Sequence, residues 1–131
     1  MGILNFFQRL TNPNREADLE GLWERVGDDF EGCFIKVEQE AGELIGKIVW
    51  ITPEMLSYGW SVNDKKWRRI EGDEKNGWQL LDLRKQFDTA TKKVLSTDYA
   101  KYWISLSGER KLHLHQSRFP LFAAQTWRKI G

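Results

Sequence analysis

The residue types that most often carry chemistry are scarce in this sequence, which contains one cysteine and two histidines. His113 and His115 alternate with Leu112 and Leu114, so a strand in this segment places both imidazoles on one face. If the leucines face the core, the histidines face solvent. Two imidazoles with no third ligand nearby in the sequence make a poor metal site, so we predict no bound metal.

The single cysteine, Cys33, alternates with Ile35 and Val37, which indicates a buried core thiol rather than a nucleophile. The sequence shows no Ser/His/Asp series, phosphate-binding loop or glycine fingerprint. Its carboxylates are spread over the faces that we expect to be polar, so no catalytic pair is evident. We therefore predict no catalytic residues and favour a function other than catalysis.

Seven tryptophans among 131 residues is a high number for a small domain. They either fill the interior, where burial of a large apolar side chain contributes roughly 1.5–3 kcal/mol, or line a cavity for a flat, apolar ligand. In the second case an inward arginine would meet a carboxylate of the ligand. The predicted cavity residues are Trp50, Trp60, Trp78, Tyr102, Arg84 and Arg118.

The run from Lys65 to Arg69 places Trp67 among four basic residues. Cationic grooves with stacking aromatic side chains bind single-stranded nucleic acid. Acidic residues on both sides dilute the charge of this run, however, and the whole chain has a formal net charge of +1. We therefore interpret the run as a solvated hairpin and predict no nucleic-acid partner.

Positioning these residues requires a sheet, and short segments rich in Val, Ile, Trp, Tyr and Phe recur from residue 21 onward. Many of these segments are apolar on one face only, so the sheet has to close or fold over itself. The predicted fold class is all-β, an antiparallel up-and-down barrel of about eight to ten strands with a short N-terminal helix. The predicted strands cover residues 22–26, 33–39, 43–51, 60–62, 67–71, 77–87, 92–95, 99–106, 111–116 and 124–130.

The sequence also predicts where the chain turns. Residues 40–42, 88–91 and 107–110 are typical of hairpin loops, two of them with a glycine that tolerates positive φ. One short helix interrupts the strands, because Thr52-Pro53 combines a capping side chain with a first-turn proline. Gly59 can end this helix.

The N-terminal segment differs in pattern from the rest of the chain. Residues 1–10 carry apolar side chains at helical spacing, and this helix either plugs one end of the barrel or docks a partner, a second copy or a membrane surface. We interpret residues 1–20 as a helical segment packing on the barrel and residues 21–131 as the single barrel domain. No run is long enough for a membrane-spanning helix and no basic leader is present, so we expect a cytoplasmic protein.

One pair of motifs links the two ends of the predicted barrel. Gly21-Leu22-Trp23 opens its first strand, and Thr126-Trp127-Arg128 lies in its last strand. This pair resembles the arrangement of calycins, the small barrels that include lipocalins and fatty-acid-binding proteins, in which an Arg from the last strand packs over the Trp of Gly-x-Trp. The resemblance implies that Gly21, Trp23 and Arg128 close the barrel, with the guanidinium stacked on the indole.

The chain is also similar to small bacterial calycin-like families of unknown function, through Gly46-Lys47-Ile48-Val49 and Gln125-Thr126-Trp127-Arg128. The loop motif of lipocalins proper, after the third and sixth strands, is not present. The resemblance therefore implies a barrel and not a lipocalin ligand. Because a histidine in the late strands of some calycin-like barrels holds haem, haem ligation through His113 or His115 is a minor hypothesis.

Two functions are compatible with these patterns. The first is a binding protein that holds a small, largely apolar molecule in a barrel cavity, whose mouth is covered by residues 53–58. The alternative is a filled barrel that acts through its surface as a non-catalytic interaction or assembly module. Its contact surface would be the N-terminal helix or the hairpin around Trp67.

Overall fold

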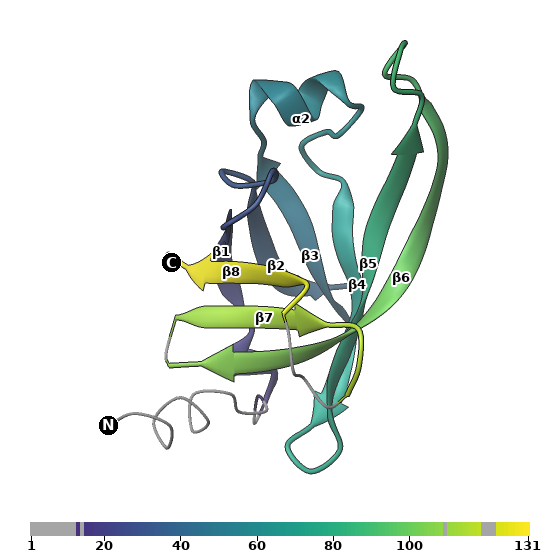
Figure 1. Ribbon diagram of the computed structural model, residues 1–131. Coiled ribbons are helices and arrows are strands. Elements are labelled where there is room, and N and C mark those ends of the chain that lie inside the picture. Colours follow the sequence, from purple (N-terminus) through teal and green to yellow (C-terminus); the bar gives the residue numbers. More distant parts are fainter. Residues whose placement is uncertain (1–12, 14, 109, 119–122) are drawn as a thin grey trace.

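A computed structural model describes residues 13, 15–108, 110–118 and 123–131 of the chain. Within these residues eight antiparallel strands form a closed barrel, in which each strand pairs with its neighbours in the sequence and β8 returns to β1 (Figure 1). This confirms the predicted all-β, up-and-down barrel. The strands are β1 Gly21–Val26, β2 Phe34–Glu40, β3 Glu43–Trp50, β4 Lys65–Asp73, β5 Gly77–Phe87, β6 Val94–Ser107, β7 Lys111–His115 and β8 Gln125–Lys129.

Alternate side chains of the strands fill the middle of the barrel. Ile35 and Val37 on β2 are buried, whereas Lys36 between them is exposed, as the alternation predicts. The rings of Trp67 and Trp127 meet edge to face across the core, with centroids 5.0 Å apart and planes at 74°. The middle of the barrel is therefore a packed core.

Two short helical segments accompany the strands. A 3₁₀ turn, η1, spans Glu16–Asp18, and α2 spans Pro53–Ser57 at one end of the barrel (Figure 1). The Thr52 hydroxyl caps α2 as predicted, since its Oγ1 accepts from the backbone N–H of Met55 at 3.2 Å. The buried side chain of Met55 anchors α2 to the core.

The helix predicted near the N-terminus falls on residues that the structure does not describe. The helix predicted over residues 1–10, and with it most of the N-terminal segment 1–20, lies outside the described residues. Among the residues that are described, no helix has the length and apolar character needed to cross a membrane.

The predicted strand over residues 60–62 is wrong. Trp60 folds back onto α2, where its backbone N–H donates to the Met55 carbonyl at 3.2 Å. A turn follows, in which the Asp64 carboxylate accepts from the backbone N–H of Ser61 at 3.0 Å. These local bonds take up the backbone groups that a strand would need for pairing.

The two strands predicted over residues 92–95 and 99–106 are one continuous strand, β6. The segment between them, Ser96, Thr97 and Asp98, is polar, and Asp98 has low strand propensity, but each of the three lies opposite a residue of the long strand β5. Cross-strand pairing therefore outweighs the local preference of this segment, and the eight observed strands replace the ten predicted segments.

A β-bulge in β4 decides which way two of its side chains point. Gly46 lies opposite Trp67, while the next residue of β3, Lys47, lies opposite Lys65, so Lys66 is one residue extra on β4. The bulge turns neighbouring side chains to the same face, and both Lys66 and Trp67 are buried. The interpretation of this run as a solvated hairpin is therefore wrong for these two residues.

Candidate functional site

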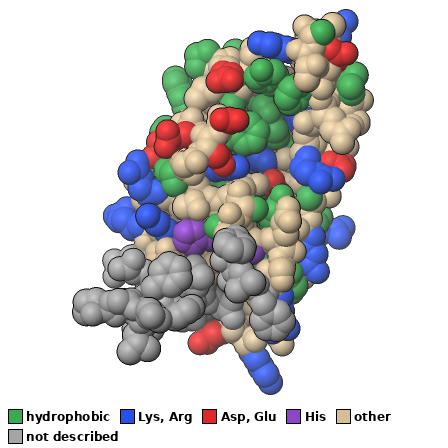
Figure 2. Space-filling view, viewed as in Figure 1, with side chains coloured by type: hydrophobic (Ala, Val, Ile, Leu, Met, Phe, Trp, Pro, Cys, Tyr) green, Lys and Arg blue, Asp and Glu red, His purple; other side chains and the backbone are tan. Residues whose placement is uncertain are grey.

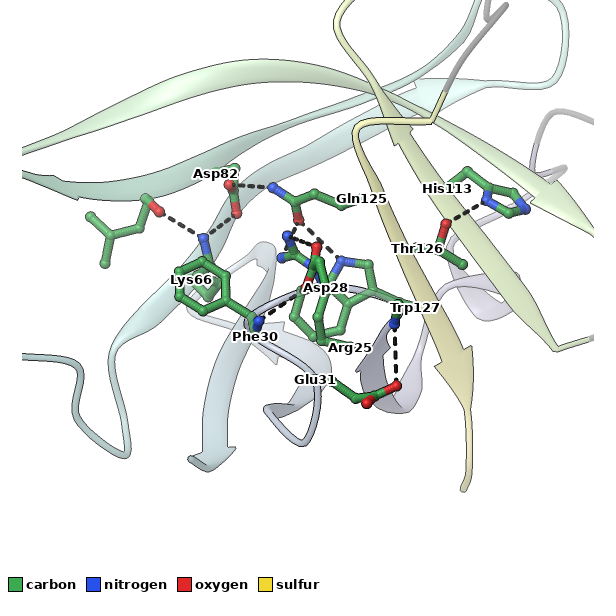
Figure 3. Close-up of polar contacts among 12 residues, drawn as sticks. Arg25, Asp28, Phe30, Glu31, Lys66, Asp82, His113, Gln125, Thr126 and Trp127 are labelled. Carbon is green, nitrogen blue, oxygen red and sulfur yellow. Dashed lines mark hydrogen bonds and ion pairs between the residues drawn. The ribbon is translucent and has the colours of Figure 1, made fainter. Parts of the chain in front are cut away.

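Four polar side chains meet inside the barrel among otherwise apolar neighbours (Figure 3). Each comes from a different strand, namely β1, β4, β5 and β8. They are Arg25, Lys66, Asp82 and Gln125, which are 5%, 2%, 2% and 9% exposed. We call this set the buried polar network.

Hydrogen bonds connect the whole network. The Lys66 ammonium donates to Asp82 Oδ1 at 2.8 Å and to the Leu83 carbonyl at 2.7 Å. Gln125 Nε2 donates to Asp82 Oδ2 at 3.0 Å, and Gln125 Oε1 accepts from Arg25 Nη1 at 2.8 Å. Because each member has a partner, the network avoids the cost of unsatisfied buried polar groups and holds its side chains in one arrangement.

Arg25 forms the outer end of the network. Its guanidinium contacts Asp28 Oδ2, with Nη2 at 2.6 Å and Nε at 2.8 Å, and lies 5.2 Å from the centroids of Phe30 and Trp127. Asp28 is itself held, because its Oδ1 accepts from the backbone N–H of Phe30 at 3.0 Å. The loop after β1 thus folds around the arginine and compensates its charge.

Lys66 forms the inner end of the network. Burial lowers the pKa of its ammonium below the usual range, while Asp82 opposes this shift. The ammonium also lies 4.8 Å from the ring centroid of Trp60, a cation–π contact. Nearby Cys33 is buried, and burial raises the pKa of its thiol to about 11, which agrees with its interpretation as an inert core residue.

A pocket of about 390 Å³ opens at the end of the barrel, where Arg25 faces outward from the network. Its walls come from the end of β1, the loop that follows, α2 and the end of β5. Figure 2 shows hydrophobic side chains gathered in the upper part of this face, with acidic side chains along one margin. The described lining residues are Arg25, Asp28, Asp29, Phe30, Glu54, Met55, Tyr58 and Phe87.

The walls of the pocket are mainly aromatic. The rings of Tyr58 and Phe87 pack against each other with centroids 4.6 Å apart, and Phe30 meets Trp60 edge to face at 5.6 Å. Met55 adds a thioether surface from α2. Apolar walls with a few fixed polar groups, at a volume within the range of small-molecule sites, make this a site for binding a small organic ligand.

The residues predicted to line a cavity are placed elsewhere. Trp60 is buried and stands behind the pocket wall against Phe30, and Trp78 is buried in the core. Tyr102 is half-buried and packs against the same core. None of these three is among the described residues that line the pocket.

The remaining three predicted cavity residues lie at the surface. Trp50 is 60% exposed at the end of β3. Arg84 is exposed and forms an ion pair with Asp98, whose Oδ1 accepts from Arg84 Nε at 3.0 Å. The Arg118 guanidinium lies 5.9 Å from the ring centroid of Trp103. The arginine that lines the pocket is Arg25.

Gly21 and Trp23 lie in the region that the calycin resemblance assigns to barrel closure. The Trp23 indole is buried and its N–H donates to the Leu19 carbonyl at 2.9 Å. Gly21 has a φ of +134°, and a Cβ at this position would lie 2.5 Å from the Gly131 carbonyl oxygen. Only glycine fits this crossing of the first strand and the chain end without strain.

The third closure residue, Arg128, does not stack on Trp23. Side chains alternate along β8, and Trp127 points into the core, so Arg128 points outward, where it pairs with Glu24. Among the described residues, the cation over the indole is Lys129, which lies opposite Trp23 in the sheet with its ammonium 5.8 Å from the ring centroid. The resemblance implies that Arg128 covers the Trp23 indole, whereas in the structure the next residue, Lys129, does so.

The two histidines of β7 alternate with the buried leucines, as predicted. The prediction that they face solvent is wrong. His115 is 2% exposed, and its Nε2 shares a hydrogen bond of 2.7 Å with the Ser105 hydroxyl. His113 is half-buried between the hydroxyls of Ser107 and Thr126, at 2.8 and 3.1 Å from its two ring nitrogens. Burial lowers the pKa of His113. The described residues contain no cluster of three metal-binding side chains.

The sequence contained a signal for most of the buried polar network that the cavity prediction missed. Arg25, Asp82 and Gln125 each lie two positions from a buried tryptophan or leucine of their own strand, so alternation alone turns them inward. Lys66 had no such signal, because its direction depends on the bulge in β4.

Comparisons of the chain with protein-family models, with curated proteins and with solved structures found no match. The closed barrel of eight antiparallel strands is compatible with the calycin-like resemblance of the sequence. The likeness thus rests on architecture and on the motif at Gly21 and Trp23.

Proposed function

We propose that this protein binds a small, largely apolar molecule in the pocket between α2, the loop after β1 and the end of β5. The observation that carries the proposal is the pocket of about 390 Å³ with aromatic walls. The proposal moves the ligand from the middle of the barrel, which is packed, to its end.

The walls would bind the ligand by excluding water from apolar surface. Phe30 and the packed pair of Tyr58 and Phe87 offer aromatic surface, and Met55 is a thioether that adapts to the shape of a guest. Residues 53–58, which the sequence predicts as the cover of a barrel cavity, contribute Glu54, Met55 and Tyr58 to the lining of this pocket. Since the network already holds Arg25, little ordering of this polar group is needed on binding.

A neutral fluorescent probe, N-phenyl-1-naphthylamine, tests the proposal. We expect saturable binding of one probe per chain, with increased emission from the apolar site. Tyr58→Ala removes part of the wall and should weaken binding about three- to tenfold, because one large ring contributes on the order of 1 kcal/mol at such a site. The matched control is Trp50→Ala, which truncates an exposed aromatic side chain outside the pocket.

Two outcomes would contradict the proposal. The first is the absence of saturable binding to a chain that is folded by circular dichroism. The second is an equal loss of affinity in Trp50→Ala and Tyr58→Ala, which would place the probe on the surface rather than in the pocket.

The alternative function, an interaction or assembly module, is favoured by the packed middle of the barrel and by exposed apolar side chains. Trp50, Leu56 and Leu95 are 60%, 61% and 69% exposed. A concentration-dependent dimer in sedimentation experiments, weakened by Trp50→Ala, would support it. A monomer at all concentrations would argue against self-assembly.

Three sequence-based expectations stay predictions. Haem ligation through His113 or His115 predicts a Soret band in the visible spectrum of the purified protein. The absence of a nucleic-acid partner predicts no shift of oligonucleotides at physiological salt. The cytoplasmic location is tested by fractionating cells that produce the protein.

A further inference from the structure

The charged groups around the pocket are unequal in number. Three of the described lining residues carry carboxylates, Asp28, Asp29 and Glu54, and one carries a cation, Arg25. The cavity and its aromatic walls identify the site, and this inequality bears on which ligand would fit it.

The cation of the lining is already neutralised. Arg25 binds Asp28 through Nη2 and Nε and donates from Nη1 to Gln125, so a ligand carboxylate would meet a guanidinium whose charge is already compensated, or would have to displace Asp28. Separating an ion pair at a largely buried guanidinium is costly. An anionic ligand is therefore disfavoured, in contrast to the expectation that an inward arginine receives a carboxylate.

Two carboxylates of the lining are not neutralised. In the described part of the chain, the side chains of Asp29 and Glu54 have no ion pair and accept no hydrogen bond. They come from two different segments that line the pocket, since Asp29 lies in the loop after β1 and Glu54 lies in α2. A cationic group in the pocket would be attracted by both carboxylates.

Other cations near the mouth do not remove this excess. The Lys92 ammonium lies 4.8 Å from the Tyr58 ring centroid, and its side chain is exposed. Lys85 is bound to Asp64 at 2.8 Å and to the Gly59 carbonyl at 2.7 Å. Counting Lys92 with Arg25, the carboxylates of the mouth still outnumber the cations.

We infer that the ligand of this pocket is a cation, an amine or quaternary ammonium attached to an apolar or aromatic body. This inference rests on the proposed function. The apolar body would occupy the space between Phe30, Tyr58 and Phe87, and the cationic group would lie toward Asp29 and Glu54. Aromatic rings and carboxylates both attract ammonium groups, and apolar walls strengthen the attraction by excluding water.

Three probes with the same ring system test the charge of the ligand. At pH 7, 1-naphthylmethylamine is a cation, 1-naphthalenemethanol is neutral and 1-naphthoic acid is an anion. Each is measured by its competition with bound N-phenyl-1-naphthylamine. We expect the cation to bind about three- to tenfold more tightly than the alcohol, as for partly exposed ion pairs, and the anion to bind most weakly. Added salt should reduce the advantage of the cation and leave the alcohol unchanged.

Charge-removing variants locate the effect. Asp29→Asn combined with Glu54→Gln keeps the size of both side chains and should remove most of the preference for the cation over the alcohol, leaving the part that the aromatic rings contribute. Glu38→Gln removes a carboxylate of β2 that does not line the pocket, and serves as the matched control. Glu38→Gln should leave the affinity for all three probes unchanged.

The outcomes separate the two proposals. If the alcohol binds as tightly as the amine, or the naphthoate binds best, the inference about charge is wrong while the proposed function stands. A preference for the cation that is undiminished in the Asp29→Asn, Glu54→Gln variant also overturns the inference, because the cationic group would then not lie toward these carboxylates. If none of the probes competes and N-phenyl-1-naphthylamine does not bind, the proposed function itself fails.

Discussion

The two inward side chains of β1, Trp23 and Arg25, stand two residues apart and belong to different regions of the barrel. Around Trp23, the buried indole fills the space and donates its N–H to the Leu19 carbonyl. The nearby Gly21 has no room for a Cβ. Around Arg25, polar groups hold one another at fixed distances and leave a pocket beside them. The same strand thus ends in a packed region on one side and in a charged, open region on the other.

The difference shows two ways of holding a barrel in shape. A packed end gains stability from buried apolar surface and is intolerant of any change in volume. A network of hydrogen bonds positions side chains without filling all the space around them, and its cost is the burial of charged groups. Only the second arrangement leaves a volume for a ligand.

The largest effect is expected at the packed end. Trp23→Ala should reduce the free energy of unfolding by about 3–5 kcal/mol, because the large cavity left by an indole collapses only in part. Urea denaturation followed by circular dichroism measures this loss. A loss below about 1 kcal/mol would show that this end is not closely packed and would remove the contrast between the two regions.

A slightly smaller effect is expected in the buried polar network. Asp82→Ala should cost about 3 kcal/mol, because it leaves the Lys66 ammonium and the Gln125 amide without their partner. The cost is limited because burial already lowers the pKa of Lys66 and eases the loss of its proton. The double variant Lys66→Met, Asp82→Leu should recover most of the stability, since apolar side chains often replace buried ion pairs at little cost. Equal losses in the single and double variants would contradict this account.

The smallest effect comes from outside both regions, at His113 on β7. Burial lowers the pKa of His113, so between its lowered value and the usual value near 6.5 the unfolded chain binds more protons than the folded one. Its contribution to stability is therefore complete above about pH 6.5 and is lost as the pH falls through the folded pKa. Stability of the wild type and of His113→Gln, compared from pH 8 to pH 5, measures this. A variant whose stability falls with the same slope would assign the pH dependence to other groups.

Much of the fold could be predicted because its causes are local. Thr52 and Pro53 begin α2 by capping geometry that involves only the next few residues. The turn after β2 has positive φ at Ala41 and Gly42, as a two-residue hairpin requires. Alternation on β2 and β7 identified the buried faces from the residue types of single strands.

The candidate site was harder to predict, because its residues are brought together from distant parts of the chain. Trp50 and Arg84 were reasonable cavity residues by type, yet one is exposed and the other is paired with Asp98. Burial of His115 on the outer face of β7 also had no signal in the alternation.

Local patterns of the sequence were therefore sufficient for the closed barrel, its turns and the inward direction of Arg25, since alternation and turn chemistry act over a few residues. The direction of Lys66 was decided by the tertiary structure, because a bulge exists only in the pairing of β4 with β3. The tertiary structure also decided the pocket, because Phe30, Tyr58 and Phe87 come from separate segments and line it together only after the barrel closes. Contacts between distant segments depend on strand register, which no single segment specifies.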